Sequence, residues 1–282
     1  MILIAESGST KCDWVLIEKP DNKVTRFRTK GLNPAVLKEK SLHKIISKEV
    51  TLINHKEAIK EIYFFGAGCN TKSNNQVLEN ILSSFFKVDT LLIAEDMMAA
   101  VYATTTKPAV VCILGTGSNC CFFDGSKILQ KTPALGYILM DEGSGNYFGK
   151  ELLKAYYYKK LSNELSISLE NRFNVSEEKV IKKLYKSKSP NKYLANFAPF
   201  LFENDKNIYI QKIIQKGIQE FVENHILHYK NELEENPIHF VGSIAFFGKK
   251  YIIKELSKHN IKVESFIRRP IDNLITHFLH IK

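Results

Sequence analysis

Two turns rich in glycine and hydroxyl side chains interrupt apolar stretches of this sequence. The first turn (SGSTK, residues 7–11) follows the apolar residues 2–5, and the second (GTGS, residues 115–118) follows an apolar run that ends at Leu114. Glycine lets the backbone approach a ligand closely, and successive N–H groups in such a turn form a concave anion site. The side chains that could add donors are those of Ser7, Ser9, Thr10, Lys11, Thr116 and Ser118. Together the two turns could hold a polyphosphate.

Carboxylates lie beside the same apolar stretches. Asp96 follows one of them where a helix is expected to begin, and Asp141 with Glu142 precedes a Gly-Ser-Gly turn. Taken singly, each acid fits a helix N-cap as well as it fits a site. Phosphoryl transfer needs one carboxylate to accept the proton of the attacking hydroxyl and another to hold Mg²⁺. Asp96 suits the first role, and Glu6 suits the second.

The elements that must position these residues alternate between strand and helix. Strand signals occur at residues 2–5, 12–17, 24–29, 61–66 and 89–94, and helix signals occur at 74–86 and from 96 onwards. The first three strands, joined by tight turns, predict an antiparallel meander. A further helix is expected after Asn33, with Pro34 at its first position. The later alternation of strands and helices predicts an α/β layer architecture.

The strand–turn–strand pattern of the N-terminus recurs about 110 residues later as AVVCILGTGSNCCFFDG. Such internal similarity predicts two related α/β domains. A largely helical region is expected over about 151–235. It precedes a strand, a Gly-Ser turn and a helix (IHFVGSIA), then a last strand and an amphipathic helix over 270–280.

Composition excludes several classes of protein. The net charge is +10, but only five of the 40 basic residues are arginine, and the lysines are spread along the chain, so nucleic-acid binding is not expected. No apolar run approaches the roughly 20 residues of a membrane span, and the start of the chain lacks the pattern of a signal peptide. Five cysteines form no Cys-x-x-Cys pair, which predicts reduced thiols on buried strands in a cytoplasmic protein. The paired histidines His225 with His228 and His277 with His280 are expected at the surface.

Four ordered motifs resemble those of the N-acetylglucosamine kinase family, within the superfamily of sugar kinases, actin and heat-shock chaperone ATPases. ESGSTKCDW resembles the first phosphate loop, LGTGSNC the second, DEGS the sugar-side acid motif, and VGSIA the adenosine-binding turn. GLNP and GAGC resemble segments of the sugar pocket. The resemblance spans nearly the whole chain.

The resemblance implies two ribonuclease-H-like (actin-like ATPase) domains with ATP and Mg²⁺ in the cleft between them, and a large helical insertion in the second domain. The domains would cover residues 1–106 with a C-terminal helix over about 270–282, and residues 107–269. By matched position, Asp96 would be the base for the sugar 6-hydroxyl. The sugar would contact Asn33, Gly68, Thr116, Gly117 and Asp141. The phosphates would lie on Gly8, Ser9, Thr10 and Lys11 and on Gly115, Thr116, Gly117 and Ser118, and the adenosine on Gly242 and Ser243.

One departure concerns Glu6, the expected metal ligand, because the first phosphate loop of the family normally carries aspartate there. Either the metal site is adjusted, or the enzyme is weakened; we favour an active kinase because Asp96 and Asp141 are both retained. The predicted substrate is an N-acetylated amino sugar, N-acetylglucosamine or N-acetylmuramic acid, and a homodimer is common among relatives. The alternatives are an ATPase that activates 2-hydroxyacyl-CoA dehydratases and a non-catalytic sugar or nucleotide sensor.

Overall fold

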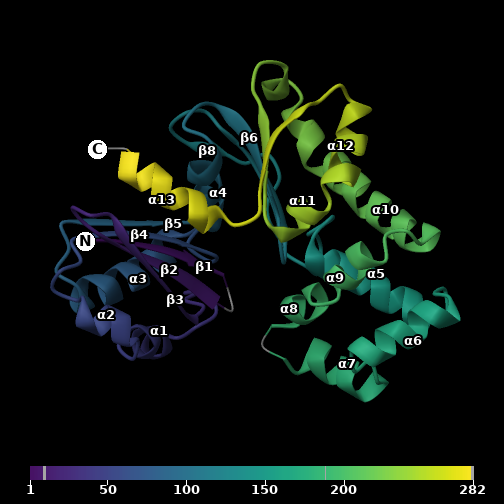
Figure 1. The fold of residues 1–282 in the computed structure, drawn as a ribbon, viewed down its shortest axis with the longest axis horizontal. Helices are drawn as coiled ribbons and strands as arrows, with labels where there is room; N and C mark the ends of the chain where they lie inside the picture. Colours follow the sequence, from purple (N-terminus) through teal and green to yellow (C-terminus); the bar gives the residue numbers. More distant parts are fainter. Residues whose placement is uncertain (9–10, 188, 281–282) are drawn as a thin grey trace. The chain divides into compact units, whose positions relative to one another are not determined.

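The computed structural model describes residues 1–8, 11–187 and 189–280, and the chain divides into two compact units. Unit 1 comprises Met1–Thr104 together with the chain from Arg269 onwards, and unit 2 comprises Thr105–Arg268. Each unit is built around one mixed five-stranded sheet with helices beside it (Figure 1). The α/β architecture expected from the sequence is therefore confirmed.

The sheet of unit 1 begins with the predicted antiparallel meander. Its strands are β1 (Ile2–Ser7), β2 (Lys11–Glu18), β3 (Lys23–Lys30), β4 (Glu61–Gly66) and β5 (Thr90–Ala94). They lie in the order β3-β2-β1-β4-β5; β1, β4 and β5 are parallel, and β2 is antiparallel to both of its neighbours. The register sets Glu6 of β1 opposite Asp13 of β2, and Asp13 opposite Arg28 of β3. Directly opposite residues share a face, so these three side chains form a row across the sheet.

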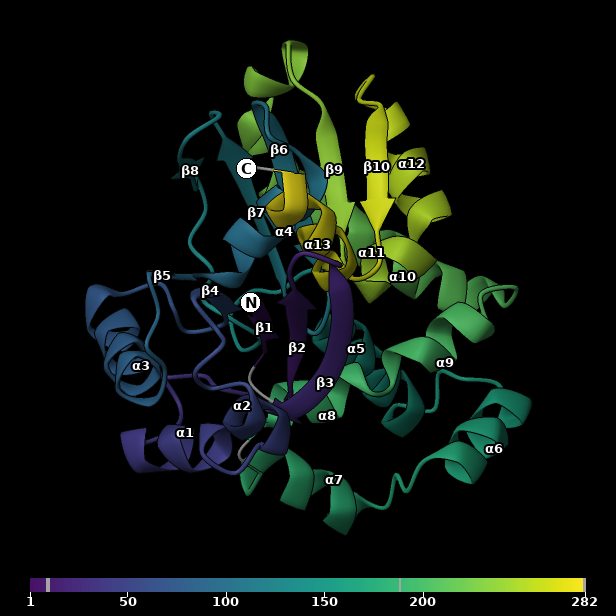
Figure 2. The same ribbon diagram turned by 60° about the vertical axis from the view of Figure 1, so that its left-hand side comes forward.

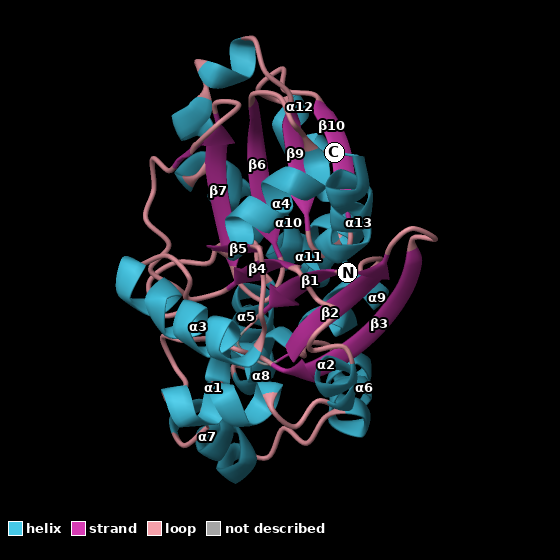
Figure 3. Cartoon of the chain, turned by 90° about the vertical axis from the view of Figure 1, so that its left-hand side faces the viewer, coloured by secondary structure: helices cyan, strands magenta, loops and turns pink. Residues whose placement is uncertain are grey.

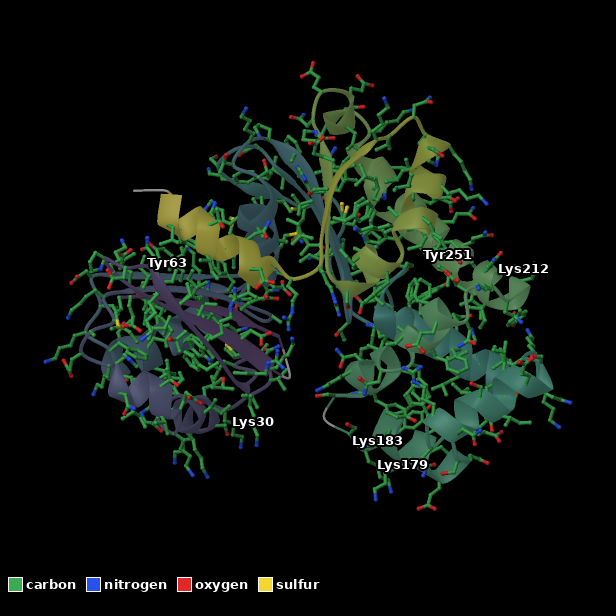
Figure 4. The ribbon with its side chains drawn as sticks, viewed as in Figure 1. Lys30, Tyr63, Lys179, Lys183, Lys212 and Tyr251 are labelled. Atoms are coloured by element: carbon green, nitrogen blue, oxygen red, sulfur yellow. The ribbon has the colours of Figure 1, made fainter. Side chains whose placement is uncertain are left out.

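Helices cover both faces of this sheet. They are α1 (Glu39–Ile46), α2 (Val50–Asn54), α3 (Lys72–Phe85), α4 (Asp96–Thr104) and α13 (Pro270–His280). The apolar side chains of α1, α2 and α3 pack on one face, and those of α4 and α13 pack on the other. Tyr63 of β4, labelled in Figure 4, stacks on Phe278 of α13 with ring centroids 4.0 Å apart. The last helix of the chain thus completes the core of unit 1.

A helix does follow Asn33, but the prediction that it begins at Pro34 is wrong. Residues 34–36 form a turn, and α1 begins only at Glu39. The side-chain oxygen of Asn33 accepts a hydrogen bond from the Ala35 N–H at 2.9 Å, and its carbonyl accepts one from Leu37 at 3.0 Å. Asn33 therefore organises a local turn, which is a common use of asparagine that competes with helix formation.

The sheet of unit 2 repeats the strand order of unit 1. Its strands are β6 (Ala109–Leu114), β7 (Ser118–Phe123), β8 (Ile128–Leu129), β9 (Ile238–Val241) and β10 (Val263–Ile267). They lie in the order β8-β7-β6-β9-β10, with β6, β9 and β10 parallel and β7 antiparallel to its two neighbours (Figure 2). The internal similarity of the two sequence halves thus corresponds to the same sheet built twice.

The region between β8 and β9 is helical (Figure 3). It contains α5 (Gly145–Tyr157), α6 (Asn163–Arg172), α7 (Glu177–Tyr185), α8 (Pro190–Ala195), α9 (Ala198–Glu203), α10 (Ile208–Asn224) and the short 3-10 helices η1 (Ile226–Tyr229) and η2 (Glu232–Glu234). After β9 come α11 (Ser243–Phe247) and α12 (Lys249–Ser257). The labelled lysines in Figure 4 (Lys30, Lys179, Lys183 and Lys212) are exposed on β3, α7 and α10, in keeping with the spread of lysines in the sequence.

Two expectations about single residues have opposite outcomes. All five cysteines are buried, and four of them lie on strands, as predicted. The prediction that His225 lies at the surface is wrong, because only 3% of it is exposed. His228, three residues later, is exposed as expected. Among the described residues, no helix is both long and apolar enough to cross a membrane.

Candidate functional site

Polar residues gather where the parallel strands of unit 1 end. The carboxyl ends of β1, β4 and β5 lie at one edge of the sheet, which is the usual place for ligands in α/β sheets. Glu6 is the penultimate residue of β1, Gly68 lies in the turn after β4, and Asp96 follows β5 as the first residue of α4. Three of the predicted site residues are therefore brought to one edge by the sheet itself.

Glu6 has a carboxyl group of strongly raised pKa at this edge. Burial, then the negative charges of Asp13 and Asp96, raise its pKa to about 7, against the opposing effects of the Lys11 ammonium and of a hydrogen bond from the Ile271 backbone N–H. The ionised group therefore lies in surroundings that disfavour its charge. A cation placed beside Glu6 would remove that penalty.

Asp13, opposite Glu6, is compensated by cations. Its two carboxylate oxygens accept hydrogen bonds from Lys11 Nζ at 2.9 Å and from Arg28 Nε at 2.5 Å. Burial alone would raise the pKa of Asp13, but these two bonds outweigh it and hold the pKa below its usual value. Lys11, expected on a phosphate, thus contacts Asp13 in this structure. Asp13 stays ionised and keeps its negative charge beside Glu6.

Asp96 is half-buried at the start of α4. Burial raises its pKa, although hydrogen bonds from the backbone N–H groups of Asp96 and Met97 act in the opposite direction. Its charge, after burial, also helps to raise the pKa of the Cys69 thiol to about 12, so Asp96 lies near the turn after β4. A half-buried carboxylate whose pKa is raised is suited to accept a proton.

Asn33 and Gly68 lie in direct contact, and Gly68 directly precedes Cys69, whose thiol pKa is raised by burial and then by the charge of Asp96. Gly68 has a φ of +84°, and a Cβ on it would lie 2.2 Å from the Asn33 side-chain oxygen. Only glycine suits both conditions. Ser7 fixes this arrangement: its hydroxyl accepts a hydrogen bond from the Leu32 N–H at 2.8 Å, and its carbonyl accepts one from the Ala67 N–H at 2.8 Å. Ser7, predicted as a phosphate donor, therefore ties β1 to both segments instead.

The first glycine turn is described in part. The Gly8 N–H donates to the Lys11 carbonyl at 3.0 Å, which closes the hairpin between β1 and β2. Gly8 is exposed, and among the described residues the nearest atom to a Cβ on it would be the Lys11 carbonyl oxygen, at 3.8 Å. Ser9 and Thr10 lie outside the described residues.

The second glycine turn, in unit 2, is held by one hydrogen bond within the turn and by two from the start of α5. The Gly115 N–H donates to the Gly117 carbonyl at 2.9 Å, and the carbonyls of Gly115 and Thr116 accept from Gly145 and Asn146 at 2.8 and 3.0 Å. Gly145 and Asn146 open α5. Thr116 remains exposed, and a Cβ on Gly115 would meet no atom of the described residues within 4 Å.

Asp141 lies against this second turn. One carboxylate oxygen accepts the Ser118 N–H at 3.1 Å, and the other accepts the Asn146 side-chain amide at 2.7 Å. A Cβ on Gly117 would lie 2.9 Å from the first oxygen, so the turn approaches the acid as closely as a glycine allows. Burial raises the pKa of Asp141 despite these bonds, and the nearby Glu142 adds to the effect. The acid is thus held at a fixed position beside the turn.

Gly242 and Ser118 complete the edge of unit 2. Gly242 has a φ of +114°, and a Cβ on it would lie 2.3 Å from the Leu114 carbonyl, so the turn after β9 packs on the turn after β6. Ser243 begins α11. The Ser118 hydroxyl is buried and has no hydrogen-bond partner among the described residues, so it is free to bond a ligand.

The residues of this chain fit a metal that is held mostly by other groups. Among the described residues no three His, Cys, Asp or Glu side chains form a group that could hold an ion by themselves. Glu6, with Asp13 and Asp96 near it, offers carboxylate charge at one point, and Mg²⁺ commonly takes one or two carboxylates with water and phosphate oxygens as the remaining ligands. The donor set therefore suits Mg²⁺ bound together with a nucleotide.

Comparison with solved structures identifies the family. A Porphyromonas gingivalis protein provisionally named as an N-acetylglucosamine kinase is 31% identical, covers 98% of both chains and superposes with a TM-score of 0.91. The chain belongs to the N-acetylglucosamine kinase-like family of sugar kinases. Two more distant structures share the fold: a provisionally named N-acetylglucosamine kinase from Chromobacterium violaceum (13% identity, 98% of both chains, TM-score 0.73) and a ROK family glucokinase from Streptomyces griseus solved with glucose and AMPPNP (11%, 98% of this chain and 97% of that one, 0.57). Neither a protein-family model nor a curated protein sequence matches the chain.

The sequence did not reveal some residues that fix the site of this N-acetylglucosamine kinase-like protein. Asn146 holds Asp141, and Ser7 holds the segments of Asn33 and Gly68. Ser7 and Asn146 each stand next to a glycine of a motif, which was the one available signal. His225, whose Nε2 lies 3.1 Å from a Glu142 oxygen, gave no such signal because it is 83 residues away in the chain.

Proposed function

We propose that the protein transfers the γ-phosphoryl group of ATP to the 6-hydroxyl of an N-acetylated amino sugar, N-acetylglucosamine or N-acetylmuramic acid. The observation that carries this proposal is Asp96: a half-buried acid of raised pKa at the carboxyl edge of the sheet, whose charge acts on Cys69 in the turn next to Gly68. Membership of a sugar kinase family supports the same conclusion.

In the proposed reaction Asp96 accepts the proton of the sugar 6-hydroxyl. The hydroxyl oxygen then bonds to the γ-phosphorus, and the bond from that phosphorus to the β,γ-bridging oxygen breaks, releasing ADP. Asn33, Gly68, Thr116, Gly117 and Asp141 would hold the sugar. Because this chemistry depends mainly on positioning and on neutralising charge, the fixed geometry of Asp141 and Asn33 serves it directly.

The two glycine turns would bind the phosphates. Gly8 and Lys11, with Ser9 and Thr10, would contact the outer phosphates together with residues 115–118, where the Ser118 hydroxyl is available. Gly242 and Ser243 would lie against the adenosine. Glu6 would hold Mg²⁺, which would neutralise charge on the phosphates when bound.

The alternative of a dehydratase activator with a shared iron–sulfur cluster has little support, because all five cysteines are buried within their own unit. A sensor without catalysis would not need an acid placed like Asp96, although Glu6 is compatible with one.

The test is ADP release from Mg-ATP with N-acetylglucosamine, N-acetylmuramic acid, N-acetylmannosamine, glucose or no sugar. We expect release that depends on an N-acetylated sugar. The 6-deoxy form of the preferred sugar should bind but not react, which would identify the accepting hydroxyl. Protein that binds ATP but releases no ADP with any of these sugars would contradict the proposal.

A further inference from the structure

A buried histidine lies beneath the acid motif of unit 2. His225 directly follows α10 and is 3% exposed. Its Nε2 lies 3.1 Å from Oε2 of Glu142, and its ring stacks on Phe221 with centroids 5.0 Å apart. Since a carboxylate accepts hydrogen bonds, Nε2 is the protonated ring nitrogen, and its N–H donates a hydrogen bond to Glu142. Nδ1 is buried without a hydrogen-bond partner among the described residues, so the bond to Glu142 is the polar anchor of the ring.

The loop that carries Glu142 is pressed onto the same helix. A Cβ on Gly143 would lie 3.0 Å from the Gly217 carbonyl and 3.1 Å from Cβ of Phe221. Gly217, Phe221 and His225 are spaced four residues apart and so lie along one side of α10. Gly217 lets the helix come close, because a Cβ there would meet Tyr147 and Phe148 at 2.6 Å. Helix α10 is therefore a platform for the acid motif.

The backbone of this loop needs support. Asp141 has a φ of +73° and Gly143 a φ of +67°. An aspartate in the left-handed region is uncommon and persists only where its surroundings hold it. The position of Asp141 in turn sets its bonds to Ser118 and Asn146. A substitution of Glu142 would therefore shift the carboxylate of Asp141.

We propose that His225 is a positioning residue for the acceptor sugar. By holding Glu142, it keeps Asp141 in its left-handed conformation with its carboxylate directed at the glycine turn. This inference rests on the proposed function, because it assigns Asp141 to the sugar. His225 itself lies beneath the loop and acts through Glu142.

Two replacements separate the hydrogen bond from the packing of the ring. His225→Gln keeps an N–H donor at a similar reach but loses the ring, whereas His225→Phe keeps a stacked ring but leaves Glu142 without this donor. We expect His225→Phe to raise the KM for the sugar about tenfold, as for a buried group left unpaired, with kcat and the KM for ATP changed less than twofold. His225→Gln should remain within about threefold of the native KM.

His228→Phe is the matched control, since His228 is the same residue type, three positions away and exposed; its kinetics should be unchanged. Glu142→Ala should match His225→Phe, and the double variant should be no worse than either single one. A native KM in His225→Phe, or a sugar KM raised equally in the Gln and Phe variants, would overturn the proposal.

Hydrogen exchange tests the same contact without any substrate. We expect faster exchange of the Ser118 N–H, which Asp141 accepts, and of the amides of residues 144–146 in His225→Phe, but not in His225→Gln or His228→Phe. Unchanged exchange at Ser118 would reject the inference even if the kinase activity is found. If no sugar is phosphorylated but exchange changes as expected, the proposed function fails while the positioning contact stands.

Discussion

The two units have separate sheets of the same strand order, and they differ in the side chains at the carboxyl ends of the parallel strands. Unit 1 gathers the carboxylates Glu6, Asp13 and Asp96, whose mutual repulsion helps to raise the pKa of Glu6. Unit 2 places Asp141 among donors, with Ser118 and Asn146 on its two oxygens. The same scaffold thus offers a charged edge, suited to proton and cation chemistry, and a donor-rich edge, suited to positioning. The predictions below test whether that difference is real.

The largest expected effect separates the two acids. Asp96→Asn removes the proposed base, so kcat should fall about a thousandfold or more, within the range found for general bases. Asp141→Asn keeps an acceptor for Ser118 but loses charge, and should act mainly on the KM for the sugar. Steady-state kinetics with the preferred sugar measure both. If the two variants lose kcat equally, the division between the edges is wrong.

The folding of both variants has to be compared with the wild-type protein, because each acid is partly or fully buried. Thermal unfolding serves as that control. An Asp96→Asn variant that folds normally and keeps full turnover would remove Asp96 from the mechanism and leave the carboxyl edge of unit 1 without its proposed base.

Glycines give a second, smaller contrast. Gly68→Ala places a methyl group 2.2 Å from the Asn33 oxygen at a positive φ, and should lower the free energy of unfolding by about 3 kcal/mol. Gly117→Ala places one 2.9 Å from Asp141 without a positive φ, and should lower it by about 2 kcal/mol. Urea denaturation measures both values.

Each of these variants has a control, which is alanine at an uncrowded glycine of the same unit. In the part of the chain that the structure describes, a methyl group on Gly8 or Gly115 meets no atom closer than 3.8 Å, so Gly8→Ala and Gly115→Ala should change the free energy of unfolding by less than about 0.5 kcal/mol. Equal losses for Gly115→Ala and Gly117→Ala would mean that close contact with Asp141 does not limit residue 117.

The sequence predicts what depends on local pattern. Apolar runs separated by glycine turns sufficed for the meander, for the second copy of the sheet, and for the start of a helix at Asp96. The helix expected from Pro34 failed because the Asn33 side chain caps a turn, a competition that propensity does not resolve. Roles of residues such as Asp96 and Asp141 stay predictions drawn from motif position and geometry.

Contacts between residues far apart in the sequence cannot be predicted from local patterns. His225 and His228 stand three residues apart in a largely helical region, a pattern that predicts two surface histidines, but His225 lies between α10 and η1 and is buried. Its burial follows from the packing of α10 against a loop 83 residues earlier. Ser7 likewise accepts hydrogen bonds from the N–H groups of Leu32 and Ala67, and the spacing of residues within the first turn does not indicate these contacts.

The last expected effect depends on pH and concerns the acidic edge of unit 1 in metal-free protein. The pKa of Glu6 is raised from 4.5 to about 7, so between these values the folded state binds more protons than the unfolded state. Stability contributed by neutral Glu6 is then fully present below pH 4.5 and is lost as pH rises through 7. Relative to Glu6→Gln, the wild type should lose about 3 kcal/mol of unfolding free energy between pH 4.5 and pH 8. Urea denaturation in a chelator measures the difference, and parallel pH profiles for the two proteins would show that burial and the charges of Asp13 and Asp96 do not raise the pKa of Glu6.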